Sequence, residues 1–474
     1  MKRAGRLERR ASAAWFFACV LCVPCVAWVL CVTLDGDRAH AQSAAPTDEG
    51  FQFGGYGRVG ISTDLEAARG KPHTVVSHGT RLEEPLYAEM DFRYRKRFGE
   101  LRLLIHTTLG FLDEFFHFSG KWDARIAIRN MYAEAEGLWD NKLSLWIGSR
   151  MYRGDDIYLF DWWPLDNLNT IGGGAGLRLG DFQLKVHIGA SRLSDPYQLQ
   201  IVRVTRPDFG TEDLAFNDRM KLVTSLKAIY EWPKLTPTLG MKAILYNEVH
   251  YLPAGQLREA NDAVRALPDD TGLVIGAQLG LWKNDGKSFA NVFVRGATGL
   301  AAYGDLSVPF GLGTDRRAAG AREFLLGTSM NWELGSSLGL MAGAYLRYFR
   351  DSDPNANDRD DGWEFAVAVR PHFYIGKYFQ QLFELSYQER RPNGLSAGSA
   401  TYLRPGAFQF AIMPTLGVGP GSYTRPQFRL VYAISALNEG ARDLYPQGDT
   451  RRGQTVQHFL GLMVEWWFQG SYRY

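Results

Sequence analysis

Carboxylates, an arginine and aromatic rings are interleaved in residues 151–173. The charged members are Arg153, Asp155, Asp156, Asp161 and Asp166, and the aromatic members are Tyr152, Tyr158, Phe160, Trp162 and Trp163. Aromatic faces pack against C–H groups, and charged groups make strong hydrogen bonds to hydroxyls. A pyranose ring offers both kinds of surface, so the segment predicts contact with a sugar. An exposed acidic loop whose aromatic residues pack on a protein wall would have the same composition.

Two further pairs combine a ring with a charge at a spacing of two residues: Tyr56 with Arg58, and Tyr87 with Glu89. Residues two apart in a β-strand lie on the same face, so each pair would present its ring and its charge to one side. The alternative is that both pairs are ordinary polar residues of a channel interior beside an aromatic residue of the rim. Which interpretation holds depends on where the strands that carry these pairs lie in the fold.

The segments around these pairs alternate apolar and polar residues. Residues 86–95 place Leu86, Ala88, Met90, Phe92 and Tyr94 on one face and Tyr87, Glu89, Asp91, Arg93 and Arg95 on the other. Residues 51–61 and 182–188 repeat the pattern, and about 18 such segments fall between residues 51 and 468. Such an apolar face could pack in the core of a soluble β-sandwich, or it could contact membrane lipid. Contact with lipid requires that the sheet close into a barrel.

The connections between these segments alternate between short and long. Short ones with turn residues occupy 98–100, 140–142, 180–181, 284–287, 335–337 and 417–422; long ones occupy 63–84, 112–123, 151–173, 191–219, 247–270, 301–320, 351–361, 390–405 and 436–453. Single-chain outer-membrane barrels have short periplasmic turns and longer external loops. The sequence therefore predicts an all-β fold, a transmembrane antiparallel β-barrel of about 18 strands with its N-terminus in the periplasm. Residues 151–173 are the candidate for an inward-folded constriction loop.

Composition and the start of the chain narrow the possibilities further. The 474 residues include 53 Lys and Arg against 51 Asp and Glu, a balance that argues against nucleic-acid binding. All four cysteines lie within the first 31 residues, which excludes a disulfide framework in the rest. A basic start, an apolar stretch over 11–34 and a small-x-small site at 39–41 predict a secretory signal peptide 1–41, followed by a barrel domain 42–474. The alternative is a retained anchor, because the apolar stretch could span a bilayer.

The remaining motifs do not favour an enzyme. Residues 455–468 alternate and close on Phe468, which resembles the C-terminal insertion signal of outer-membrane barrels, and a short tail 469–474 follows. No nucleophile motif adjoins a histidine, and His73 and His78 lie five residues apart, a spacing that shares no face of a helix or strand. The glycine-rich stretch 172–176 precedes no helix, so we interpret it as a flexible loop entering a strand rather than a phosphate loop. We expect no cofactor, metal or catalytic residue.

Several segments, in their order and spacing, resemble the maltoporins, a family of trimeric, 18-stranded, sugar-specific porins. The matching stretches are 55–60, 87–89, 146–152, 160–163, 174–177, 369–371, 425–426 and 465–467. In that family a row of aromatic residues, the slide, guides the sugar and an ionic track flanks it. The resemblance therefore implies a homotrimer and a carbohydrate solute.

The resemblance assigns the individual roles. It puts Tyr56, Tyr87 and Trp467 on the slide, Trp163 where the channel narrows, and Trp122 near a slide position that a neighbouring subunit contributes. It puts on the ionic track Arg58, Arg81, Glu89, Arg129, Arg153, Asp156 and Asp161. On later strands the match falls on Val292 and Glu364 instead of aromatic residues, and a shift of one residue changes the face of the sheet. We therefore expect a shorter slide, and a preferred sugar that can differ.

These observations favour a porin in the outer membrane of a Gram-negative cell, with its outer face in lipid. The preferred function is facilitated diffusion of maltose, maltodextrins or similar oligosaccharides. The first alternative is a porin for another small solute, such as a non-maltose disaccharide or small ions. A barrel enzyme or adhesin is the third possibility, since a fold alone does not decide function.

Overall fold

The computed structural model describes residues 49–71, 73–82, 86–112, 120, 125–208, 210–355, 358–396 and 401–468. The predicted signal peptide, the tail 469–474 and Trp122 lie outside these residues. Within them, no helix has the length and hydropathy needed to cross a membrane.

Eighteen strands form one closed antiparallel sheet. They are β1 (Gly50–Thr63), β2 (Tyr87–Phe98), β3 (Leu101–Leu112), β4 (Arg125–Gly137), β5 (Leu143–Arg153), β6 (Asn167–Leu179), β7 (Phe182–Ser191), β10 (Lys221–Trp232), β11 (Leu239–Leu252), β14 (Asp270–Lys283), β15 (Phe289–Gly299), β16 (Arg322–Leu334), β17 (Leu338–Arg350), β18 (Gly362–Ile375), β19 (Phe379–Pro392), β20 (Gly406–Gly417), β21 (Gln427–Leu437) and β22 (Val456–Phe468). Each strand pairs with the next one along the chain, and β22 pairs with β1, where Tyr56 lies opposite Trp467. The predicted barrel of about 18 strands is confirmed.

The two faces of the sheet carry different side chains, as the alternation predicts. Outward-facing residues are apolar and exposed, as in Phe51 (66% exposed), Ile61 (70%) and Ile147 (71%). Inward-facing residues of the same strands are polar or aromatic and buried, as in Tyr56 (3%) and Asp91 (0%). An apolar outer face with every strand edge paired is the arrangement that a bilayer requires.

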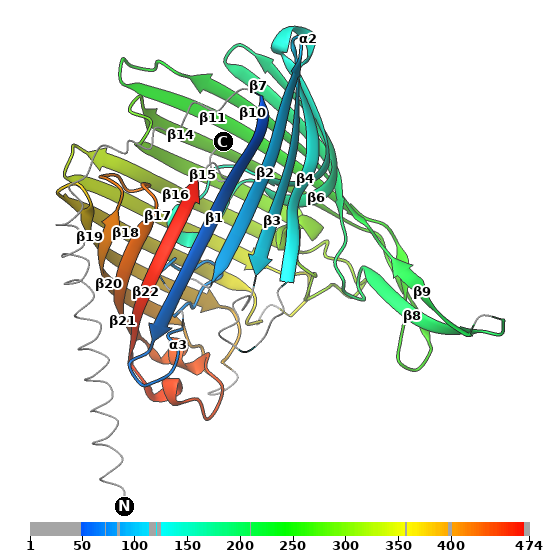
Figure 1. Ribbon diagram of the computed structural model, residues 1–474. Coiled ribbons are helices and arrows are strands. Elements are labelled where there is room, and N and C mark those ends of the chain that lie inside the picture. The colour runs from blue at the N-terminus through cyan, green and yellow to red at the C-terminus, as the bar shows by residue number, and fades with distance from the viewer. Residues whose placement is uncertain are drawn as a thin grey trace, which may run out of the picture.

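Short and long connections alternate around the barrel (Figure 1). Positive φ angles at Gly99 (64°), Gly180 (61°) and Gly335 (74°) close three of the short turns, where a side chain would strain the backbone. The long connections carry small elements of their own: β8 (Leu199–Arg206), β9 (Gly210–Asp218), β12 (Gly255–Arg258), β13 (Val264–Leu267) and α3 (Glu439–Asp443). Figure 1 shows the β8–β9 hairpin projecting beyond the barrel wall at the rim that carries these connections.

The glycine-rich stretch 172–176 lies inside β6, so its interpretation as a flexible loop was wrong. A Cβ on Gly172 would lie 2.1 Å from the carbonyl oxygen of Ile188, and one on Gly174 would lie 2.5 Å from the indole nitrogen of Trp146. Glycine is therefore required here because a neighbouring strand and an indole ring approach the backbone closely.

The third long connection, residues 154–166, folds into the barrel, as the sequence predicts for a constriction loop. Its apolar residues Ile157, Leu159 and Leu165 are at most 1% exposed and belong to the same buried cluster as Phe293 of β15. An ion pair at each end of the loop joins it to the wall: Asp155 with Lys242 of β11 (2.7 Å), and Asp166 with Lys227 of β10 (2.6 Å). The loop therefore lies against β10 to β18 and leaves the inner faces of β1, β2 and β22 beside its tip.

Residues 73–82 of the first long connection also enter the barrel, which the sequence did not predict. The backbone N–H of Val75 donates to Gln388 Oε1 (3.1 Å) and that of His78 to Tyr345 Oη (3.2 Å). The backbone N–H of Arg81 donates to the carbonyl of Leu159 (3.0 Å) in the constriction loop. Two loops from different parts of the chain thus support each other inside the lumen.

The topology predicts which connections a membrane-impermeant maleimide reaches in intact cells. Ser336→Cys lies in the short turn between β16 and β17, and Asn355→Cys lies in the long connection that follows β17. With short turns in the periplasm, the reagent should label Asn355→Cys and leave Ser336→Cys unlabelled until the outer membrane is permeabilised. The unsubstituted chain supplies the background. Labelling of Ser336→Cys alone would reverse the orientation.

Candidate functional site

Four aromatic rings form a row along the inner wall beside the constriction loop. Tyr87 of β2 lies 5.8 Å from Tyr56 of β1, Tyr56 lies 6.4 Å from Trp467 of β22, and Trp467 lies 6.2 Å from Tyr423 in the turn after β20, all between ring centroids. Strand pairing accounts for three of the rings, because Tyr56 faces Trp467 directly and Tyr87 lies diagonally across the neighbouring strand, within reach of an aromatic side chain. Tyr158 from the tip of the constriction loop adds a fifth ring, 5.2 Å from Tyr423.

Arginine side chains cover the faces of these rings. The guanidinium of Arg58 lies 5.3 Å from the Tyr87 centroid, that of Arg129 lies 5.5 Å from it, and that of Arg425 lies 4.1 Å from Trp467. Tyr87 is consequently only 5% exposed, whereas Trp467 remains half-buried. A cation–π contact of this kind is worth about 0.5–2 kcal/mol, so a solute that replaces it meets a modest barrier.

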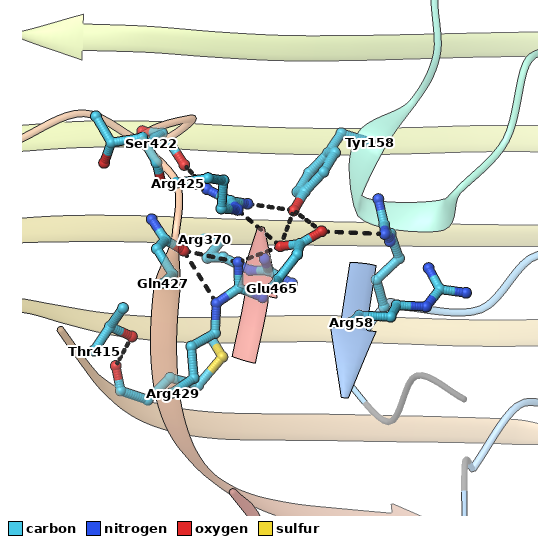
Figure 2. Close-up of polar contacts among 12 residues, drawn as sticks. Arg58, Tyr158, Arg370, Thr415, Ser422, Arg425, Gln427, Arg429 and Glu465 are labelled. Atoms are coloured by element: carbon cyan, nitrogen blue, oxygen red, sulfur yellow. Dashed lines mark hydrogen bonds and ion pairs between the residues drawn. The ribbon is translucent and has the colours of Figure 1, made fainter. Parts of the chain in front are cut away.

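Glu465 of β22 is the centre of a polar network that includes Tyr158, Arg425 and Arg429 (Figure 2). Its side chain is 3% exposed, and its carboxylate accepts hydrogen bonds from Tyr56 Oη (3.1 Å), Tyr158 Oη (3.0 Å), Arg425 Nε (2.9 Å), Arg429 Nη2 (2.7 Å) and Arg81 Nη2 (3.5 Å). These partners come from β1, both inward-folded loops, the turn after β20, and β21. One buried carboxylate therefore joins the constriction loop to the wall that carries the aromatic row.

Asp161 supplies the most accessible carboxylate of the site, with 36% of its side chain exposed. Its oxygens lie 3.6 Å from Arg58 Nη1 and 3.9 Å from Arg81 Nη1. Burial raises the pKa of Asp161, but Arg81, Arg58 and Arg153 together outweigh that effect and hold the pKa below its usual value. The group is therefore an acceptor for hydroxyl donors at neutral pH, next to guanidinium donors.

Two further parts of the predicted ionic track lie on either side of this centre. Glu89 accepts hydrogen bonds from Tyr87 Oη and Arg129 Nη1, which fixes the Tyr87 ring and the arginine over it. Arg153, at the end of β5, lies 3.9 Å from the ring centroid of Trp163 and donates from Nε to Asn167 (2.8 Å). The structure thus brings the predicted residues together around the tip of the constriction loop.

Two predicted residues occupy different surroundings from those expected. Trp163 is 8% exposed, so most of its ring packs against protein. Asp156 makes no hydrogen bond or ion pair with another residue in the described part of the chain; burial raises its pKa to about 6, against the opposing effect of Arg81. Trp122, which lies outside the described residues, keeps its predicted role untested.

The structure also explains why the slide does not continue on later strands. Val292 faces outward and is 50% exposed, whereas its neighbour Phe293 faces inward and is completely buried beneath the constriction loop. Glu364 faces inward, is 5% exposed and accepts hydrogen bonds from Ser77 of the first loop (3.0 Å). The inward-facing positions of β15 and β18 are therefore covered by the two loops, which leaves the row to β1, β2 and β22.

Sequence reasoning did not assign Tyr423, Arg425, Arg429 or Glu465 to the site. The alternation of β22 already put Glu465 on the same face as Trp467, two residues away, so that signal was available. No comparable signal exists for Tyr423 and Arg425, because they belong to a turn whose path into the lumen is set by contacts with Glu465 and Tyr158.

The chain is similar in sequence to proteins named maltoporin. The chain is 24% identical to the maltoporin of Vibrio cholerae serotype O1 over 450 residues, which cover 90% of this chain and 97% of the relative. It is 24% identical to the maltoporin of Photobacterium profundum over 359 residues, covering 73% and 71% of the two chains. Among solved structures, Pseudomonas aeruginosa OccK3 (OpdO) aligns with a TM-score of 0.42 at 13% identity, over 89% of this chain and 97% of the other.

The family comparison covers the whole barrel. The model of the LamB porin family matches residues 51–468, from the first strand to the last residue of β22. A porin is a transport channel of the outer membrane rather than an enzyme. Since the match spans every strand and both inward-folded loops, this chain belongs to the LamB porin family.

Proposed function

We propose that the chain is a sugar-selective channel that lets maltodextrins or similar oligosaccharides diffuse across the outer membrane. The observation that carries the proposal is the row of Tyr87, Tyr56, Trp467 and Tyr423, with neighbouring ring centroids 5.8–6.4 Å apart. Trp467 and Tyr423 are partly exposed and offer apolar platforms to the C–H faces of linked sugar rings. Tyr56 (3% exposed) and Tyr87 (5%) offer theirs once a sugar displaces the arginines that lie over them. The names of the two curated relatives support the same solute class.

The charged groups beside the row supply the other half of the chemistry. Arg58 and Arg129 carry donors over the face of Tyr87, and Asp161 is a partly exposed acceptor 3.6 Å from Arg58. A sliding sugar loses water from its hydroxyls, and these groups can replace the lost hydrogen bonds. Several weak sites in a row favour conduction, because a solute must bind well enough to enter and weakly enough to leave.

A second candidate is passage of another small solute, such as a non-maltose disaccharide or small ions. The burial of Phe293 beneath the constriction loop favours it, because the row of rings is confined to β1, β2, β22 and the turn after β20. A short row binds a short saccharide as well as a long one, so chain length gives little gain in affinity.

We also propose a homotrimer, on the family resemblance. Closure of single channels in three equal steps supports a homotrimer, and closure in one step contradicts it.

Liposome swelling with a panel of sugars tests the proposed function. Vesicles that contain the purified protein should swell with maltose and maltotriose faster than with a disaccharide of the same mass but different linkage. Equal rates for all disaccharides would favour the unselective alternative. The absence of swelling with any sugar, from a channel that conducts ions, would contradict the proposal.

Replacing Tyr87 by Ala should weaken block of the ion current by maltotriose. The lost ring contact is worth about 1 kcal/mol, which corresponds to roughly a fivefold rise in the half-blocking concentration. Tyr94→Ala is the matched control, since Tyr94 lies on the same strand but faces outward, with 46% exposed. Tyr87→Phe keeps the ring and should keep most of the block. Unchanged block in Tyr87→Ala, or equal loss in Tyr94→Ala, would remove Tyr87 from the sugar path.

The charge of Asp156 should make ion selectivity depend on pH. With a pKa of about 6, its carboxylate is ionised at pH 8 and largely neutral at pH 5. Asp156→Asn should therefore shift the reversal potential in a KCl gradient toward anion selectivity at pH 8, and the variant and the wild type should converge at pH 5. An equal difference at both pH values would contradict the raised pKa.

A further inference from the structure

Two arginines lie opposite each other on the outer face of the barrel, at the rim with the long connections. Arg322 is the first residue of β16 and Arg350 is the last residue of β17, and their Cα atoms are paired in the antiparallel ladder. Both side chains are exposed, while the adjacent residues Glu323 (7% exposed) and Phe349 (5%) face the interior. The two guanidinium groups therefore project from the same outer surface of neighbouring strands.

The charges of this pair are only partly balanced by the described protein residues. Like charges directly opposite each other in a sheet are destabilising. Arg350 has one carboxylate in reach, Asp361, at 3.9 Å from its Nε, and Asp361 is itself buried. Within the ranges that the structure describes, no residue forms an ion pair or hydrogen bond with the Arg322 side chain. By contrast, the outward-facing Arg391 of β19 is paired with Glu389 at 2.5 Å.

Aromatic residues mark the depth of the pair in the membrane. Tyr348 precedes Arg350 by two residues on β17 and lies 4.8 Å from Trp363 of β18, between ring centroids. Phe324, two residues after Arg322, faces outward with 42% exposed. Tyr and Trp side chains gather at membrane interfaces, and two residues of a strand span about 7 Å, so the arginines lie at headgroup level above this belt.

We propose that Arg322 and Arg350 together bind a phosphate group of an outer-leaflet lipid. The oxygens of one phosphate group can accept hydrogen bonds from both guanidinium groups. The phosphate then bridges two positive charges that otherwise repel each other. The aromatic belt beneath them contacts the acyl chains of the same lipid, which a free phosphate cannot do. The site lies on the opposite face of the wall from the sugar path, so it is independent of the proposed function.

Binding of lipid A to the purified full-length protein tests the site. Native mass spectrometry should detect at least about tenfold more bound bisphosphorylated lipid A than dephosphorylated lipid A on the wild type, as expected for two arginines at a membrane surface. The Arg322→Gln/Arg350→Gln double variant should lose that preference. Lys377→Gln, in the short turn between β18 and β19, should retain it because it lies at the other rim.

Three outcomes would overturn the proposal. The first is equal binding of the two lipids by the wild type, and the second is an unchanged preference in a double variant that still migrates as a folded barrel. The third is loss of the preference in millimolar inorganic phosphate, which would assign the pair to a soluble anion. A second readout is thermal stability: the double variant should melt lower than the wild type in vesicles with lipid A, and no lower in phosphatidylcholine alone.

Discussion

The buried carboxylate of Glu465 is the interaction on which the interior of the barrel depends. It accepts hydrogen bonds from groups on two strands, two inward-folded loops and one turn, with only 3% of its surface exposed. Taking a charge out of water is costly, and the surrounding arginines and tyrosines compensate for that cost. Removing one partner of such a buried pair typically costs about 3–5 kcal/mol, because it leaves a buried charge without compensation. A constriction loop held in this way has one position relative to the aromatic row.

That position determines which part of the wall a solute meets. The constriction loop and the first loop cover inner faces from β10 to β20, through contacts such as Asp155 with Lys242 of β11 and Thr80 with Gln409 of β20. The wall that they leave carries Tyr87, Tyr56 and Trp467, and the loop tip contributes Asp161 and Tyr158 to its edge. The position of the two loops therefore determines the proposed sugar path as much as the sequence of the strands does. The same placement explains why aromatic residues on later strands take no part in it.

The barrel itself could be predicted from the sequence because its determinants are local. Alternation of apolar residues, turn residues in the short connections and the order of short and long connections are properties of neighbouring residues, and the observed strands confirm them. The constriction loop was predicted for a related reason, since its aromatic and charged residues are concentrated in one segment. Its bounds were too wide, because the glycines of β6 were interpreted as loop rather than as positions of close strand approach.

The remaining features depend on contacts between distant parts of the chain, which no local pattern encodes. The path of residues 73–82 into the lumen is set by partners more than 250 residues away, such as Tyr345 and Gln388. The stacking of Arg425 on Trp467 depends on the course of a turn. The resemblance placed Val292 at a slide position, but Val292 faces outward and the adjacent Phe293 faces inward. A shift of one residue in the alignment of a strand exchanges its inner and outer faces.

The most direct test of the account is the block of ion current through single wild-type channels by maltooligosaccharides of increasing length. Stacking on successive rings predicts that the half-blocking concentration falls with each added glucose unit until the row of Tyr87, Tyr56, Trp467 and Tyr423 is filled, and then levels off. A half-blocking concentration that is the same for every length, or a current that no sugar of the series reduces, would contradict it.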